Sequence, residues 1–171
     1  MYSDKFKNLV LYILNSDDYV DGGIKKLNKI LYFYRDNEKF ISDASYAKAN
    51  MGPIVHGYKM IFEEMEKDKI LFKNNCCGVF FHKPIMNPDV SIFSSKELDH
   101  LHKVLKKYGH LTSAELESIS HEQQPWILTE NFGDIIDRDL ALLMNDEEDC
   151  EYSLDNEALK NEIEALANSV C

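Results

Sequence analysis

The chain has 171 residues, the size of one ordinary domain. Hydrophobic residues make up 44% and charged residues 29% of the sequence, which excludes wholesale disorder and a fibrous repeat. The formal charge of −11 argues against direct nucleic-acid binding, because phosphate contacts need a positive surface. The acidity suits a basic protein partner, and it equally suits solubility alone.

The location of the protein is predicted from its apolar runs and cysteines. The longest apolar runs, such as Leu9 to Leu14, fall far short of the roughly 20 residues that cross a bilayer. The start of the chain, Met1 to Lys5, lacks the basic and apolar regions of a secretory signal. Cys76 and Cys77 are adjacent, a poor framework for disulfides. We expect a cytoplasmic protein with reduced thiols and no membrane partner.

Two amphipathic helices are predicted first. Apolar residues at helical spacing from Phe6 to Leu14 give one helix, which ends before the turn-forming Ser16 to Gly23. The second helix follows. Its expected inner face carries Ile24, Leu27, Ile30, Leu31 and Tyr34, and its expected outer face carries mostly Lys25, Lys26 and Lys29.

A third helix and a β-hairpin are predicted next. Gly52-Pro53 reads as a helix start, because proline is tolerated at the first helical position, and the helix is expected to continue to Met65. Aromatic and branched residues at 70–72 and 79–81 flank turn residues such as Gly78. This pattern predicts a hairpin of two short strands.

Three further helices complete the expected fold. Ser94 and Thr112 each precede a glutamate by three residues, so each opens a helix with a capping box. The first of these helices stops at Gly109, the second runs toward Trp126, and a sixth helix is expected over 132–144. The fold class is therefore mainly α (α+β), a compact bundle of about six helices with one short β-hairpin.

The sequence divides into a body, residues 1–145, and an acidic C-terminal tail, residues 146–171. The tail opens with a dense acidic run from Asp146 to Glu151, followed by apolar residues at roughly helical spacing. Three alternatives stay open for it: docking on the body as a short helix, folding against a partner, or remaining solvated.

Catalytic and metal-binding motifs are weak. Neither the nucleophile elbow of hydrolases nor the glycine-rich phosphate loops occur in the sequence. Cys76, Cys77 and His82 cluster, and His100, His102 and His110 lie near one predicted helix, but neither set has the usual spacing of a zinc site. We expect no enzyme activity, no cofactor and no metal.

Several short segments, taken in order, form a recognisable set. They are Lys26 to Phe33, Met51 to Val55 with Gly57, Tyr108-Gly109, Ser113 to Leu116, Ser120-His121 and Trp126. Together they resemble the Panacea, or SocA-like, antitoxin domain family, and the resemblance covers roughly Gly22 to Glu130. Met51, where many members have tyrosine, and Tyr34 to Asp36 depart from the family pattern, which bears on partner choice more than on fold.

This resemblance implies a compact, mainly helical domain that neutralises a protein toxin of bacteria or phages. The family's toxins include toxic relatives of small alarmone synthetases, so the expected function is direct binding that blocks the active site of such an enzyme. One SocA-like antitoxin instead delivers its toxin to an ATP-dependent protease, and this adaptor role is the alternative. A homo-oligomer also stays open.

The candidate residues fall into two groups. Interface anchors are often aromatic, so toxin binding is expected of exposed side chains among Tyr32, Tyr34, Tyr46 and Met51. Specificity is expected in the irregular stretch 41–50, the hairpin tip and the acidic tail, because loops vary without unfolding a scaffold. A structural role is expected of Leu27, Leu31, Gly52, Pro53, His121 and Trp126.

Overall fold

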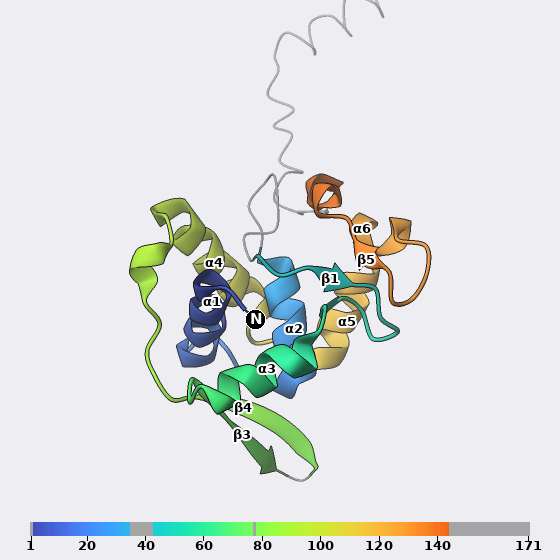
Figure 1. The fold of residues 1–171 in the computed structure, drawn as a ribbon. Coiled ribbons are helices and arrows are strands. Elements are labelled where there is room, and N and C mark those ends of the chain that lie inside the picture. The colour runs from blue at the N-terminus through green and yellow to red at the C-terminus, as the bar shows by residue number, and fades with distance from the viewer. Residues whose placement is uncertain (1, 35–42, 77, 144–171) are drawn as a thin grey trace, which may run out of the picture.

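The computed structural model describes residues 2–34, 43–76 and 78–143. Within these ranges the fold is mainly α (α+β), as predicted, with six α-helices and short antiparallel strands (Figure 1). Helix α2 (Gly23–Phe33) lies in the middle of the molecule, and nine of its eleven residues are buried. It packs against α4, α5, β2 and β4, so it is the central element of the core.

The first two helices form as predicted. Helix α1 (Asp4–Asn15) begins after Ser3, whose hydroxyl accepts a hydrogen bond from the Phe6 backbone N–H and so satisfies one of the free donors of the first turn. Its inner face contributes Phe6, Leu9, Val10, Leu11 and Ile13 to the core. Both helices therefore follow from the spacing of their apolar residues.

The lysines of α2 differ from expectation. Lys26 and Lys29 are buried, with 1% and 0% of their surface exposed, whereas the sequence placed them mostly on the outer face. A buried ammonium group needs hydrogen-bond acceptors, and backbone carbonyls from other parts of the chain supply them here. The prediction failed because two of the three carbonyls, those of Gly109 and Pro53, are remote in sequence from the lysines that they accept from.

A small sheet lies beside α2. Strands β1 (Tyr46–Ala47), β2 (Ile54–Val55) and β5 (Ile135–Ile136) pair in the order β2-β1-β5, and both pairings are antiparallel. The sheet is fastened to α2, because the Val55 backbone N–H donates to Asn28 Oδ1 at 2.8 Å. Residues far apart in sequence thereby meet on one side of the central helix.

The predicted helix start at Gly52-Pro53 is wrong. Gly52 has a φ of +85°, a left-handed conformation that suits the turn between β1 and β2, and the residues after Pro53 enter strand β2. Helix α3 (Tyr58–Lys67) begins only after Gly57. Strand pairing with β1 therefore overrides the local tendency of proline to open a helix.

The hairpin is present and longer than predicted. Strands β3 (Leu71–Cys76) and β4 (Val79–Pro84) pair from Leu71 with Pro84 to Cys76 with Val79. Near its tip the Gly78 backbone N–H donates to Asn75 Oδ1 at 3.1 Å. The hairpin projects from the end of the molecule below α3 (Figure 1).

Both predicted capping boxes are found. Helix α4 (Ser95–Tyr108) is capped by Ser94 with Glu97, and helix α5 (Ser113–His121) is capped by Thr112 with Glu115. A short 3-10 helix (Val90–Ile92) precedes α4. These local signals suffice to start a helix, because each box satisfies two backbone donors of the first turn.

The predicted sixth helix at 132–144 is wrong. The sixth helix is α6 (Gln124–Leu128), and the later residues form β5 and a 3-10 helix, η2 (Arg138–Leu143). Gly133 has a φ of +96°, and its backbone N–H donates to the Lys48 carbonyl at 2.8 Å. Pairing with the strand that contains Ala47 thus draws this stretch out of helical geometry.

The apolar core of the described residues runs from Phe6 to Ile136, so we expect the body to fold without the tail. A chain truncated after Asn145 should keep one cooperative thermal transition, with a midpoint within a few degrees of the full chain's. Circular dichroism during heating measures this. A broad or absent transition in the truncated chain would show that residues 146–171 belong to the core.

Candidate functional site

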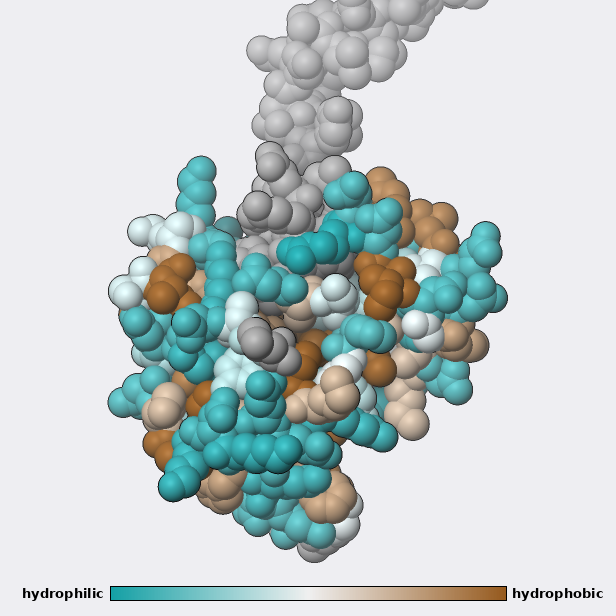
Figure 2. Space-filling view, viewed as in Figure 1, coloured by the Kyte–Doolittle hydropathy of each residue, from teal (hydrophilic) through white to brown (hydrophobic). Residues whose placement is uncertain are grey.

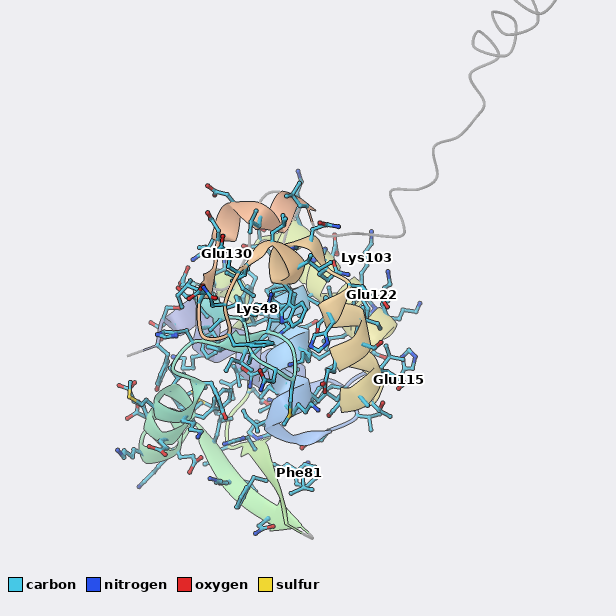
Figure 3. All side chains as sticks on the ribbon, turned by 90° about the vertical axis from the view of Figure 1, so that its right-hand side faces the viewer. Lys48, Phe81, Lys103, Glu115, Glu122 and Glu130 are labelled. Atoms are coloured by element: carbon cyan, nitrogen blue, oxygen red, sulfur yellow. The ribbon has the colours of Figure 1, made fainter. Side chains whose placement is uncertain are left out.

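Residues from several of the segments singled out by sequence come together between α2, the β1–β2 turn and the α5–α6 corner. We call this group the motif cluster, and Figure 3 looks onto the side of the molecule where α5 covers it. Leu27 and Leu31 lie in the core beside it, with 2% and 0% exposure. The cluster comprises Lys29, Gly52, Pro53, Ser120, His121 and Trp126.

Gly52 is the tightest point of the motif cluster. A Cβ atom placed on it would lie 2.4 Å from Ser120 Oγ and 2.8 Å from Lys29 Cε, closer than real Cβ contacts come. Only glycine fits there, because the position combines a left-handed backbone with two neighbouring side chains. The turn is thereby held in van der Waals contact with both α2 and α5.

Lys29 fastens the same turn electrostatically. Its buried Nζ donates to the Pro53 carbonyl oxygen at 3.1 Å. Removal from water lowers the pKa of Lys29 to about 8, with Glu117 opposing the shift and Lys25 adding to it. Lys25 itself forms an ion pair with Glu117 across α2 and α5. The Lys25–Glu117 ion pair therefore joins α2 to α5, and Lys29 holds the β1–β2 turn against α2.

A stacked pair of rings closes the cluster. His121 and Trp126 stack with ring centroids 4.1 Å apart, and Lys48 Nζ lies 4.4 Å from the centre of the Trp126 ring. Lys48 Nζ also donates to the Thr129 carbonyl oxygen at 2.6 Å. Burial lowers the pKa of His121 and favours the neutral ring, with Glu117 opposing the shift and the neighbouring lysines adding to it. The arrangement packs α5, α6 and β1 against one another.

Lys26 is a second buried lysine of α2. Its Nζ donates to the carbonyl oxygens of Val20 and Gly109, at 2.5 and 2.6 Å, and lies 5.0 Å from the Tyr19 ring. Sequence reasoning missed a role for Lys26, Lys29 and Lys48. The sequence does show lysines among the apolar residues of a predicted helix. Lysine side chains are usually exposed, however, so a buried role was not expected for them.

The three candidate anchor tyrosines are not exposed. Tyr32 and Tyr34 have no exposed surface and Tyr46 has 1%, so the expectation of surface aromatics at these positions is wrong. The Tyr46 hydroxyl donates to the Leu31 carbonyl at 2.6 Å, and the Tyr34 hydroxyl donates to the Glu97 carbonyl at 3.1 Å. These contacts explain the burial. Of the four candidates, Met51 is the exposed one, at 57%.

The cysteine and histidine groups are dispersed. Cys77 lies outside the described residues, and His82 is buried on β4, with Nε2 3.1 Å from Glu66 Oε1. Among the residues that the structure describes, no three metal-ligating side chains gather into a site. In the same part of the chain no helix is both long and apolar enough to span a bilayer.

Comparison with known families gives one match. The model of the family described as antitoxin SocA-like, Panacea domain, matches residues 27–127. The matched range contains every member of the motif cluster, together with Leu27 and Leu31. The chain has no significant match among the curated proteins or among the solved structures.

Proposed function

The chain belongs to the SocA-like Panacea antitoxin domain family, and from that membership we propose that it neutralises one cognate protein toxin by binding it directly. The family match carries this proposal, because it spans more than half of the chain and supports an antitoxin role. The toxin is the expected partner, and no nucleic acid is required.

The contacts of the motif cluster and of the neighbouring Lys48 support binding over catalysis. Lys29 is engaged by the Pro53 carbonyl, Lys48 by the Thr129 carbonyl, and His121 by the Trp126 ring. A general acid or base must reach a substrate proton, and these groups instead contact other parts of the fold. We therefore assign the cluster to shaping the scaffold that presents the toxin-binding surface.

The charge of the chain supports a toxin with a basic surface. Residues 146–171 contain nine of the 30 acidic residues and one of the 19 basic residues, so they carry −8 of the total charge of −11. An enzyme that acts on a nucleotide or on tRNA presents positive charge to its substrate. A toxic enzyme related to the small alarmone synthetases, blocked at its active site, fits this requirement.

Neutralisation should be stoichiometric and sensitive to salt. We expect inhibition to be complete near one equivalent of this chain, and we expect the association rate to fall at least tenfold from about 0.01 M to 0.15 M salt. The dissociation rate should change less, since contacts buried in the interface are screened less than surface charges. Stopped-flow binding to the protein encoded beside this chain's gene measures both rates.

Two outcomes would contradict this proposal. Inactivation of the toxin by far less than one equivalent would indicate catalysis. Loss of the toxin only in the presence of an ATP-dependent protease would indicate the adaptor role. Truncation after Asn145 is the matched test of the tail's contribution, because it removes −8 of formal charge in one step.

A further inference from the structure

Four exposed apolar side chains lie at the α6–β5 side of the molecule. Ile127, Leu128, Phe132 and Ile135 are each about half exposed or more, with Phe132 at 62%. We call them the α6–β5 surface. In Figure 2, several hydrophobic groups lie at the upper right of the molecule, with hydrophilic side chains between them. Single exposed apolar residues are ordinary, but four within nine positions of one corner form a patch of the kind that binds proteins.

The α6–β5 surface is held by rigid contacts. The ring of Phe132 lies 6.4 Å from that of Trp126, with Lys48 Nζ 5.8 Å from the Phe132 ring. Ile135 is paired with Ala47 in the small sheet, and the Lys48 backbone N–H donates to the Asp134 carbonyl at 2.9 Å. Preordered aromatic side chains make good interface anchors, because little conformational entropy is lost on binding.

Exposed acidic residues lie in the same stretch of sequence as these apolar side chains. From residue 122 to residue 139 the chain has one basic residue, Arg138. Figure 3 labels two of the acidic residues, Glu122 and Glu130, on this side of the molecule. An apolar centre with a charged rim is the usual anatomy of a protein interface. The exposed acidic residues of this stretch are Glu122, Glu130, Asp134, Asp137 and Asp139.

We propose that the α6–β5 surface is where the toxin docks, and that it receives an apolar segment of the toxin flanked by lysine or arginine. This inference rests on the proposed function. Charge selects the occupant: the chain's own tail carries −8, and a second copy would bring the same carboxylates against one another. A partner with a basic surface would not be repelled by these carboxylates.

The extent of the family match supports this placement. The match ends at residue 127, so Leu128, Phe132 and Ile135 follow the matched residues. The motif cluster lies inside the match, whereas three of the four side chains of the α6–β5 surface lie outside it.

Replacement of two anchors tests the proposal. The double variant Leu128→Ser/Phe132→Ser should weaken binding of the protein encoded by the neighbouring gene at least 100-fold, while its thermal transition stays that of the parent chain. The matched control is Phe72→Ser/Phe80→Ser on the hairpin, where the side chains are 49% and 47% exposed. The control should bind within threefold of the parent chain, and the reverse ranking would overturn the proposal.

A charge variant keeps the test decisive if the double variant unfolds. Glu122→Lys/Glu130→Lys alters two exposed side chains and should slow association at least tenfold at low salt, whereas an unchanged rate would overturn the proposal.

Other occupants of the surface would give different results. If the parent chain forms a dimer that Leu128→Ser/Phe132→Ser dissociates, the surface belongs to a second copy and the proposal is overturned. Tighter binding by the chain truncated after Asn145 would assign it to the tail. A parent chain that does not bind the neighbouring gene's product would instead refute the proposed function, and this inference with it.

Discussion

Gly52→Ala is expected to lower the free energy of unfolding by about 2 to 6 kcal/mol. Part of this loss comes from the left-handed backbone at φ +85°, which costs a residue with a side chain about 1 to 3 kcal/mol. The rest comes from the added methyl group, which would lie 2.4 Å from Ser120 Oγ and so force α5 away from the turn, a further cost of about 1 to 3 kcal/mol.

Two variants separate these costs. Gly57 has a similar φ of +72° and no atom within 4 Å of an added Cβ, so Gly57→Ala reports the backbone cost alone. Ser120→Ala removes the nearest atom, so Gly52→Ala should be less costly in that background. Urea denaturation gives all the free energies. Equal losses for Gly52→Ala and Gly57→Ala would show that α5 accommodates the methyl group without strain.

The pH dependence of stability should reveal the buried charge of Lys29. Its pKa is about 8 in the folded protein, and the ordinary value is 10.5. Between these pH values the unfolded chain binds more protons than the folded one, so this residue's contribution to stability rises with pH. The rise should reach about 3 kcal/mol, because each unit of pKa difference corresponds to about 1.4 kcal/mol. Below pH 8 the full cost of burying the charge is present.

Comparison with Lys29→Met isolates this contribution. The stability of the parent chain minus that of Lys29→Met should increase from pH 7.5 to pH 10, as measured by urea denaturation at each pH. Lys67→Met, which removes an exposed lysine of α3, controls for the loss of one positive charge. A difference that stays flat over this range would mean that Lys29 remains fully charged in the folded protein, with water reaching its Nζ.

Local signals explain which parts of the fold could be predicted. The capping boxes at Ser94 and Thr112 satisfy backbone donors within three residues, and the turn near Gly78 is formed by its own neighbours. The apolar stripes of α1 and α2 likewise lie within one element. Such elements form wherever the surrounding chain is placed, so the sequence contains the information needed for them.

The mistaken predictions concern residues whose partners are remote in sequence. The β1–β2 turn is shaped by Lys29 and Ser120, and residues 133–136 pair with a strand that lies nearly ninety positions earlier. Tyr46 is buried because its hydroxyl reaches the Leu31 carbonyl, which periodicity does not show. The family resemblance is confirmed over residues 27–127. It did not indicate that lysines in this range face inward or that tyrosines in it are covered.

The pairing of β5 with β1 affects the order in which parts of the fold form during synthesis. Tyr46 pairs with Ile136, so the edge of β1 must wait for about ninety further residues, roughly 5 to 20 s of translation. Helices α1 to α5 can pack in that time, whereas Phe132 and Ile135 are made after all six α-helices of the described residues. A chain that ends before Asp134 lacks the strand that pairs with β1, so one edge of β1 stays unpaired until residues 135–136 are made.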